Sequence, residues 1–450
     1  MSTEMSIELV IRGGTVVTVD PDDRVVVADV AIGAGRILAI GVSIDAPGVP
    51  TLDASDAVVM PGFVNAHMHE TLDRGIFEDL PFTQWLNDFA LPKDRAYEPR
   101  HMRAAALMNQ AEMIAGGTTS CIDIFRHPGE AAAVALQSGM RMTFSPQVVD
   151  DPLGPGETLG TNLSFIEEWN GRSPLIRTWF GPHGLYSCLP ETYIAMREHA
   201  DRLGVGIHTH LAESRDETPI VAARSGGLSP VEYLDRLIGL GPDVVAAHCV
   251  ELTDRDLARL AETSTGIAHC PTSNAKIGNG VARLTEMIAA HARVGLGTDS
   301  NMTNNNLDMF EEMRMAALVQ KQRHADPTVM KSAEVLRLAT MGSAAVLGLA
   351  EEVGSVQVGK AADLIVVDLR AAHTHPVLRG SRATNVVEHL VWSCAAADVR
   401  HTIVAGRVLM RDRQLLTIDV EEAASLADAE AQHLLRSAGV FDDRFGAVDA

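Results

Sequence analysis

The sequence predicts an α/β protein in which a (β/α)8 barrel is inserted into a small β-sandwich built from both chain ends. Two strand-rich segments, residues 1–60 and 352–415, flank a middle region, residues 61–351, in which short apolar runs alternate with helical patterns. This alternation is typical of parallel strands joined by helices, and roughly eight repeats of it match a TIM-type barrel. Residues 416–450 are expected to form a helix and a tail packed on the outside.

The two strand-rich segments have the same character. The segment IELVIRGGTVVTVDPDDRVVVADVAIGAGRILAIG is dense in β-branched residues and is interrupted by Gly-Gly, Pro-Asp-Asp and Gly-Ala-Gly. Residues 354–369 and 399–412 repeat this pattern of strand, turn and strand near the other end. Because neither segment is expected to form a stable β-domain alone, we expect the two to pair and form one sandwich.

The middle region has a different rhythm. Its apolar runs include TTSCIDIF, VGIHTHLAE, DVVAAHCV and RVGLGTD. Residues 99–116, 190–204 and 280–292 have apolar positions three and four apart, which indicates helices. Right-handed crossovers between such units give parallel strands. A barrel is the leading prediction, and an open doubly wound sheet is the alternative.

Charge and cysteine content exclude several classes of partner. The formal net charge is −22, and a surface this acidic repels nucleic acid and anionic lipid headgroups, so neither is expected to bind. The N-terminus lacks the pattern of a signal peptide, and no apolar stretch is long enough to span a membrane, which predicts a cytoplasmic protein. Free thiols in a reducing compartment are expected for the five scattered cysteines, Cys121, Cys188, Cys249, Cys270 and Cys394.

Polar residues interrupt the barrel strands where these strands are expected to end. His67 and His69 in VNAHMHE are two residues apart, so both point to the same face if this segment is extended. His208 and His210 in IHTHLAE have the same spacing, and spacing alone does not decide which of them faces a metal. Asp299 ends the run GLGTD, where it is either an oxygen ligand or the N-cap of the next segment.

These residues together predict a catalytic metal site at the barrel mouth, because the carboxyl ends of barrel strands converge there. Imidazole and carboxylate without thiolate suit Zn²⁺, with Fe²⁺ and Mn²⁺ as alternatives. Binuclear barrels of this type commonly bridge two metals with a modified lysine, and the chain has no lysine between Thr119 and Glu213. The sequence therefore predicts one metal ion per subunit.

The chain resembles the amidohydrolase superfamily over nearly its whole length. Within it, the likeness is greatest to the cytosine deaminase-like branch that includes 5-methylthioadenosine/S-adenosylhomocysteine deaminases and triazine hydrolases. The stretches that carry the resemblance, in chain order, are PGFVNAHMH, DLPFTQWL, GGTTSCIDIF, GPHGLYSC, HTHLAES, AAHCVEL, HCPTSNAKIGNGVARLTEMI, GLGTDSNMTNNNLDMFEEMR and GSVQVGKAADLIVVDL.

The resemblance implies a role for each matching residue. It implies that His210, rather than His208, joins the metal set, and that Glu213 is the proton shuttle. It places His248 of AAHC beside the activated water or the substrate. The implied metal ligands are His67, His69, His210 and Asp299, the implied catalytic residues are Glu213, His248 and Asp299, and the residues expected to contact substrate are His183, Trp85, Lys93 and Asn304.

Two departures from the family pattern fall in segments expected to contact substrate. Adenosine-type members carry a glutamate suited to a ribose diol where this chain has Lys93 in ALPKD, and a shift by one residue lets Asp94 serve instead. Lys93 is either a solvated loop cation or a pocket residue that favours an anionic or carbonyl-rich substrate. The second departure is Gly184-Leu185, where a small residue and proline are usual. Both departures argue against a nucleoside.

The expected function is a metal-dependent hydrolytic deaminase of an N-heterocycle of the purine or nucleoside, pyrimidine, pterin or s-triazine type. The alternatives are hydrolysis of an amide, urea or carbamate by the same site and triazine dechlorination. Glu213 favours a leaving group that needs a proton, which means nitrogen. The resemblance also implies a homodimer or homotetramer that acts on a small molecule. Glu70, next to His69, is left as a possible pocket-lining residue.

Overall fold

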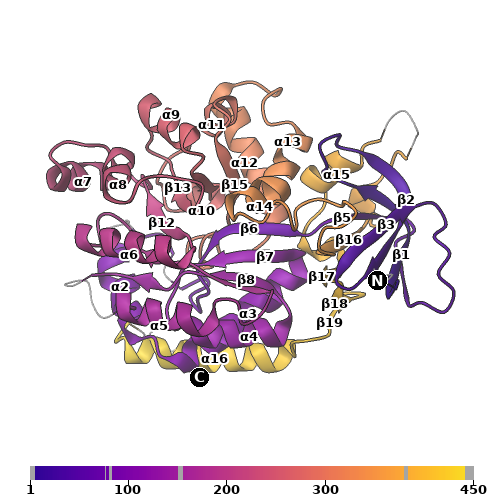
Figure 1. Cartoon of the computed structure of the whole chain (residues 1–450), viewed down its shortest axis with the longest axis horizontal. Helices are drawn as coiled ribbons and strands as arrows, with labels where there is room; N and C mark the ends of the chain where they lie inside the picture. Colours follow the sequence, from indigo (N-terminus) through magenta and orange to yellow (C-terminus); the bar gives the residue numbers. More distant parts are fainter. Residues whose placement is uncertain (1–5, 77, 81–83, 151–155, 380–383, 441–450) are drawn as a thin grey trace.

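The structure is a computed structural model that describes residues 6–76, 78–80, 84–150, 156–379 and 384–440. It has two parts, a strand-rich part and a barrel with surrounding helices (Figure 1). The strand-rich part is built from segments near both ends of the chain, because the first strands lie beside strands from near its C-terminus.

The strand-rich part is a nine-stranded sheet drawn from both chain ends. The strand order is β19-β18-β17-β16-β5-β1-β2-β3, and β4 pairs with β1. The antiparallel pairing of β5 with β16 joins the two ends of the chain. The strands are β1 (Leu9–Val17), β2 (Val25–Gly33), β3 (Arg36–Gly41), β4 (Thr51–Asp53), β5 (Ala57–Pro61), β16 (Leu364–Asp368), β17 (Val399–Val404), β18 (Arg407–Arg411) and β19 (Gln414–Leu415).

The two central strands of this sheet separate two hydrophobic cores. Successive side chains of a strand point to opposite faces, so alternate residues can serve different cores. In β5, Val59 packs in the core of the sheet domain, whereas Val58 and Met60 pack in the barrel core. In β16, Val366 and Val367 divide in the same way. A continuous apolar run in these strands therefore reflects burial on both faces.

The barrel consists of parallel strands, two of which are interrupted. With each interrupted strand counted once, the described residues form the eight strands of a TIM-type barrel. Isolated bridges from Phe180 to Ile207 and from Gly184 to His210 join its two halves. The strands are β6 (Phe63–Met68), β7 (Thr118–Asp123), β8 (Arg141–Phe144) with β9 (Gln147–Val148), β10 (Ile176–Thr178) with β11 (Gly181–Pro182), β12 (Ile207–Leu211), β13 (Val244–His248), β14 (Gly266–His269) and β15 (Arg293–Leu296).

The end of β15 closes the barrel against β6. The backbone N–H of Asp299 donates to the carbonyl of His67 (3.0 Å), and the N–H of Thr298 donates to Asn65 Oδ1 (3.1 Å). Gly297 makes this approach possible, because a Cβ at this position would lie 2.9 Å from the His67 backbone. The closure excludes an open sheet. Strand β15 itself ends at Leu296, so Asp299 follows the strand instead of ending it.

Helices surround the barrel and follow most of its strands (Figure 1). They are the π-helix η1 (Trp85–Ala90), α2 (Leu91–Ala96), α3 (Pro99–Gly116), α4 (Pro128–Ser138), α5 (Leu159–Trp169), α6 (Pro190–Leu203), α7 (Glu217–Ser225), α8 (Pro230–Ile238), α9 (Asp254–Glu262), α10 (Pro271–Lys276), α11 (Leu284–Ala289), α12 (Met309–His324), α13 (Ser332–Arg337), the π-helix η2 (Leu338–Gly342), α14 (Ser343–Val346), the 3-10 helix η3 (Ala372–Thr374), α15 (Val386–Trp392), the 3-10 helix η4 (Ala396–Asp398) and α16 (Val420–Ser437).

The last helix, α16, lies along the outside of the barrel and packs against α3 and α2 (Figure 1). Arg100 at the start of α3 forms a two-pronged pair with Glu430 of α16, with both N···O distances at 2.7 Å. Among the described residues, no helix is long and apolar enough to cross a membrane. The predicted fold class is confirmed, whereas the residue boundaries of the domains and the cytoplasmic location stay predictions. The predicted tail beyond residue 440 lies outside the described residues.

A buried ion pair connects the barrel to the sheet domain. The guanidinium of Arg141 in β8 donates from Nε to Asp363 Oδ2 (2.8 Å) and from a terminal nitrogen to Oδ1 (3.1 Å). Asp363 precedes β16, and both side chains are buried. The pair therefore connects strands of the two parts.

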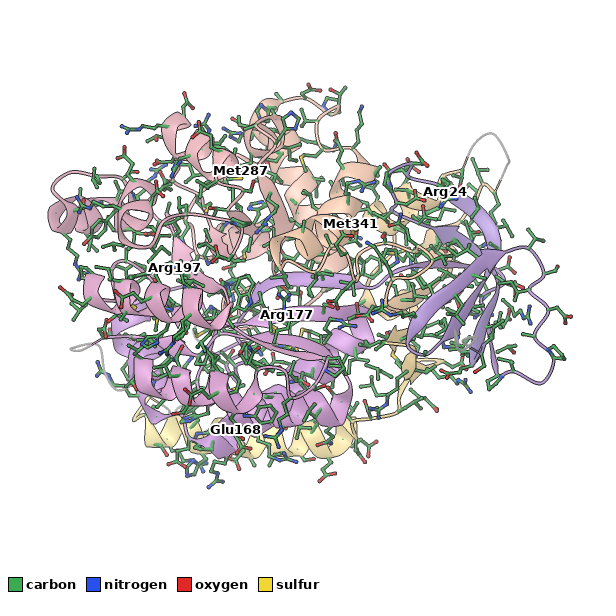
Figure 2. The ribbon with its side chains drawn as sticks, viewed as in Figure 1. Arg24, Glu168, Arg177, Arg197, Met287 and Met341 are labelled. Carbon is green, nitrogen blue, oxygen red and sulfur yellow. The ribbon has the colours of Figure 1, made fainter. Side chains whose placement is uncertain are left out.

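We expect Arg141→Met to lower the free energy of unfolding by roughly 3–5 kcal/mol, because it leaves a buried carboxylate without its counter-charge. The measurement is urea denaturation followed by circular dichroism. The control is Glu168→Gln, which breaks an exposed pair with Arg172 and should stay within about 0.5 kcal/mol of the wild type. Glu168 lies near the outer edge of the molecule (Figure 2). Equal losses in both variants would contradict the prediction.

Candidate metal centre and active site

The polar residues singled out from the sequence meet at the carboxyl ends of the barrel strands. His67 lies in β6, with His69 one residue past its end, and His210 lies in β12. His248 is the last residue of β13, and Asp299 follows β15. All five side chains are buried. Asp299 and His248 have positive φ angles of 61° and 72°, a conformation that costs free energy and is typical of functional sites.

The nitrogen and oxygen atoms of the predicted metal set converge. Asp299 Oδ1 lies 3.4 Å from His67 Nε2 and 3.4 Å from His69 Nε2. His69 Nε2 lies 3.2 Å from His210 Nε2. Four donor atoms on three different barrel strands or strand ends thus face one small volume.

The contact between His69 and His210 is not an ordinary hydrogen bond. The Nδ1 of His69 lies 2.6 Å from the carbonyl of Ile124, and the Nδ1 of His210 lies 2.6 Å from the carbonyl of His183. A carbonyl only accepts, so both Nδ1 atoms carry the proton and both Nε2 atoms present lone pairs. Two lone pairs 3.2 Å apart repel each other unless a cation lies between them. The residues present therefore fit a divalent metal ion.

The protonation of the site agrees with this fit. Burial lowers the pKa of His67 to about 3, and it also lowers the pKa of His69 well below its ordinary value, so both rings are neutral. Burial alone would raise the pKa of Asp299, but the neighbouring histidines hold it well below its usual range. Its second oxygen, Oδ2, accepts hydrogen bonds from Ser273 Oγ (2.6 Å) and Thr303 Oγ1 (2.9 Å). Neutral imidazoles beside an ionised carboxylate are the state that binds a metal.

Glu213 and His248 lie next to this donor set. Glu213 Oε1 accepts a hydrogen bond from Asn279 Nδ2 (3.0 Å) and lies 3.9 Å from His248 Nε2. Burial alone would lower the pKa of His248, but the carboxylates of Glu213 and Asp299 outweigh it and raise this pKa. Nδ1 of His248 lies 2.9 Å from Asn274 Oδ1, which leaves Nε2 to face the two carboxylates. Glu213 and His248 are thus placed to exchange a proton with a group bound beside Asp299.

A cavity of about 910 Å³, partly open to solvent, covers these residues. Three of the four residues predicted to contact substrate line this cavity together with the predicted catalytic residues. The residues that line it include Trp85, Lys93, Asp94, Arg126, Gln147, His183, Tyr186, Glu213, His248, Asp299 and Met302.

Lys93 is not a solvated loop cation, because its side chain is only 1% exposed. Its Nζ lies 2.5 Å from Asp73 Oδ2 and 3.2 Å from Asp94 Oδ1. Burial alone would lower the pKa of Lys93, but the two carboxylates raise it. Because one cation faces two carboxylates, this group of three carries a net negative charge. Lys93 is therefore not an uncompensated positive charge that an anionic substrate edge could use.

Asn304 and Glu70 lie away from the cavity wall. Asn304 Nδ2 donates to Glu312 Oε1 (2.7 Å) and to the carbonyl of Thr298, so substrate contact by Asn304 stays a prediction without geometric support. Glu70 Oε1 accepts a hydrogen bond from Gln110 Nε2 (3.0 Å), and neither Glu70 nor Asn304 is among the cavity residues.

Several supporting residues were missed in the sequence. Ser273, Asn274 and Asn279 all lie in the stretch HCPTSNAKIGNG, which the resemblance quotes without assigning roles to its polar residues. The available signal was a dense run of polar residues directly after a predicted strand. Sequence spacing gave no partner for any of them, because their partners Asp299, His248 and Glu213 lie on other strands.

A (β/α)8 barrel that holds three imidazoles, a carboxylate and a nearby glutamate at its mouth defines a metal-dependent hydrolase. A model of the amidohydrolase family matches residues 58–409, and the chain belongs to this family. The resemblance drawn from the motifs is thereby confirmed, as is the expectation that the protein is a hydrolase.

Similar proteins are known along nearly the whole chain. The chain is 39% identical over 436 residues to the 5-methylthioadenosine/S-adenosylhomocysteine deaminase of Pelotomaculum thermopropionicum. The matched region covers 95% of this chain and 99% of that protein. It is 36% identical over 436 residues to the 5'-deoxyadenosine deaminase of Methanosarcina barkeri, with coverage of 95% and 98%. A zinc-bound structure of an adenosine deaminase from Xanthomonas campestris has a TM-score of 0.90, 31% identity and coverage of 96% and 100%.

A buried glutamate under the site provides a test by pH. Glu312 of α12 accepts a hydrogen bond from Asn304, and burial raises its pKa from 4.5 to about 8. Between these two values the folded protein binds more protons than the unfolded chain, so this group makes stability fall as pH rises. Above pH 8 the buried Glu312 is ionised, and its cost to the free energy of unfolding no longer changes with pH.

We expect Glu312→Gln to remove this penalty, since glutamine keeps the shape and the acceptor oxygen without a charge. The difference in the free energy of unfolding between variant and wild type should shift in favour of the variant from pH 5 to pH 8, by up to roughly 1.4 kcal/mol for each pH unit. Calorimetry at the two pH values measures it. A difference that is the same at both pH values would show that Glu312 ionises normally.

Proposed function

We propose that this chain is a hydrolytic deaminase of adenosine-type nucleosides altered at the 5' position, with one divalent metal ion per subunit and zinc as the preferred ion. The observation that carries the proposal is the convergence of imidazole lone pairs and a carboxylate beside Glu213. The proposed metal ligands are His67 Nε2, His69 Nε2, His210 Nε2 and Asp299 Oδ1.

The relatives support a nucleoside substrate, because those compared above are named for adenosine derivatives and are matched over nearly their whole length. The geometry removes the objection drawn from Lys93. Its charge is compensated by Asp73, and Asp94 beside it has a partly exposed carboxylate in the cavity wall. A carboxylate accepts hydrogen bonds from hydroxyl groups, so Asp94 takes the part expected of the family's glutamate.

The proposed mechanism assigns a step to each residue. A divalent ion held by these four ligands would lower the pKa of a water molecule toward neutrality and so supply the oxygen nucleophile. Glu213, held by Asn279, would accept a proton from the attacking water and pass it to the amino nitrogen, so that a ring C–O bond forms as the C–N bond breaks and ammonia leaves. His248 Nε2 lies 4.0 Å from Asp299 Oδ2, where it would stabilise the negative charge that develops on the attacking oxygen. Trp85 and His183 line the cavity in which the ring is held.

The first experiment is an ammonia-release assay on the metal-loaded protein. We expect turnover of 5'-methylthioadenosine, S-adenosylhomocysteine and 5'-deoxyadenosine, and little turnover of free bases or triazines. Glu213→Gln should lower kcat by about 10²- to 10⁴-fold with the metal content unchanged, because it removes the proton carrier and keeps the shape. Glu262→Gln on the exposed face of α9 is the control. Failure of the fully metal-loaded protein to release ammonia from any nucleoside would refute the proposal.

The second experiment tests recognition of the ribose. We expect Asp94→Asn to raise KM for adenosine derivatives about tenfold, since a charged acceptor for the sugar hydroxyls is lost. The effect should vanish with a 2',3'-dideoxynucleoside, which has no hydroxyls to offer. Asp88→Asn, a change at an exposed position of η1, serves as the control. A KM that rises equally for both kinds of substrate would rule out this role for Asp94.

A further inference from the structure

His208 points to the same side of the barrel as the metal set without joining it. It lies two residues before His210 on β12, which the strand period places on the same face. Its Nε2 lies 2.8 Å from His67 Nδ1, on the side of that ring opposite the nitrogen that faces Asp299. His208 is fully buried, as is His67.

His67, His208, Ser145 and the carbonyl of Asp123 form a row of hydrogen bonds. The direction of each bond follows from the carbonyl at its end. Ser145 Oγ lies 2.8 Å from the carbonyl oxygen of Asp123, and a carbonyl only accepts, so the hydroxyl proton lies between these two atoms. Ser145 Oγ also lies 2.9 Å from His208 Nδ1. Because its single proton is already used, Ser145 accepts at this contact and His208 Nδ1 carries a proton.

The remaining steps are then determined. A buried imidazole with no carboxylate at its nitrogens is neutral, since an uncompensated charge there is costly. A neutral His208 with its proton on Nδ1 presents a lone pair at Nε2. His67 must therefore donate from Nδ1 to His208, and His67 Nε2 is left as a lone pair that faces Asp299.

We propose that His208 and Ser145 are positioning residues that hold His67 in the tautomer needed to bind the metal. The inference rests on the proposed metal site and adds what this chain uses to prepare its first ligand. His69 and His210 have their Nδ1 protons fixed directly by backbone carbonyls, Ile124 and His183. Within the described ranges no backbone carbonyl lies at His67 Nδ1. This nitrogen is held instead by the His208 imidazole and, through it, by the Ser145 hydroxyl, which donates to the carbonyl of Asp123.

Substitutions at position 208 should differ in effect according to whether the new side chain can accept a hydrogen bond from His67 Nδ1. Leucine offers no acceptor, so His67 is free to take the wrong tautomer. Glutamine can place an amide oxygen near the position of Nε2 and accept the same proton. Loss of an outer partner of a metal-binding histidine typically weakens metal affinity by about 10- to 100-fold. A purely space-filling role for His208 would not distinguish the two substitutions in this direction.

The experiment measures zinc affinity of the full chain after removal of metal by a chelator, by competition with a chromophoric zinc indicator. We expect His208→Leu to weaken zinc binding by about 10- to 100-fold and His208→Gln to restore most of it. Ser145→Ala should weaken binding by about threefold or more, because His208 is then free to reverse its tautomer. The visible absorption of Co²⁺-loaded protein reports the geometry of the site independently of activity.

Ser120→Ala is the matched control, because Ser120 of β7 is buried and its hydroxyl has no hydrogen-bond partner among the described residues. It should bind zinc as the wild type does. Circular dichroism and thermal melting of each variant verify folding, and Ser145→Ala is mild enough to stand alone if His208→Leu does not fold. Zinc affinities of the 208 and 145 variants equal to the wild type would overturn the inference, whereas a wild-type chain that binds no metal would overturn the proposed function.

Discussion

Repulsion between lone pairs at the barrel mouth is the constraint on which the site depends. Nε2 atoms of His69 and His210 are 3.2 Å apart and both are unprotonated, so they are stable at this distance only with a cation between them. Holding them there requires each ring to be neutral and each Nδ1 proton to have an acceptor. The hydrogen bonds that these histidines make at Nδ1 are therefore as much a part of the site as the metal-binding nitrogens are.

The frame of the protein supplies the rigidity that this arrangement needs. Gly297 lets the end of β15 approach His67, so the carboxylate of Asp299 arrives beside a histidine from the first barrel strand. The alternate faces of β5 and β16 bury side chains in both the barrel and the sheet domain, and Arg141 adds a buried ion pair between the two parts. The sheet domain is thus packed against, and ion-paired with, the barrel that carries the ligands.

The charge around Lys93 depends on its neighbours and not on the lysine alone. Lys93 alone predicts an anionic partner, but Asp73 at 2.5 Å and Asp94 at 3.2 Å reverse the sign of the local charge. A neutral hydroxyl donor is compatible with that environment. The chain thus has lysine in place of the usual glutamate and keeps a carboxylate, Asp94, one residue later in the cavity wall.

The sequence by itself determined the fold class and the family, because strand periodicity, alternation with helices and the order of the motifs are properties of neighbouring residues. It also brought His67 and His69 together, since a spacing of two places both on one strand face. Spacing left His208 and His210 equivalent, and only the family resemblance favoured His210. The tertiary structure supplies the physical difference: His210 faces His69, whereas His208 faces His67 and Ser145. The direction of a hydrogen bond depends on atoms from distant strands, which no local pattern encodes.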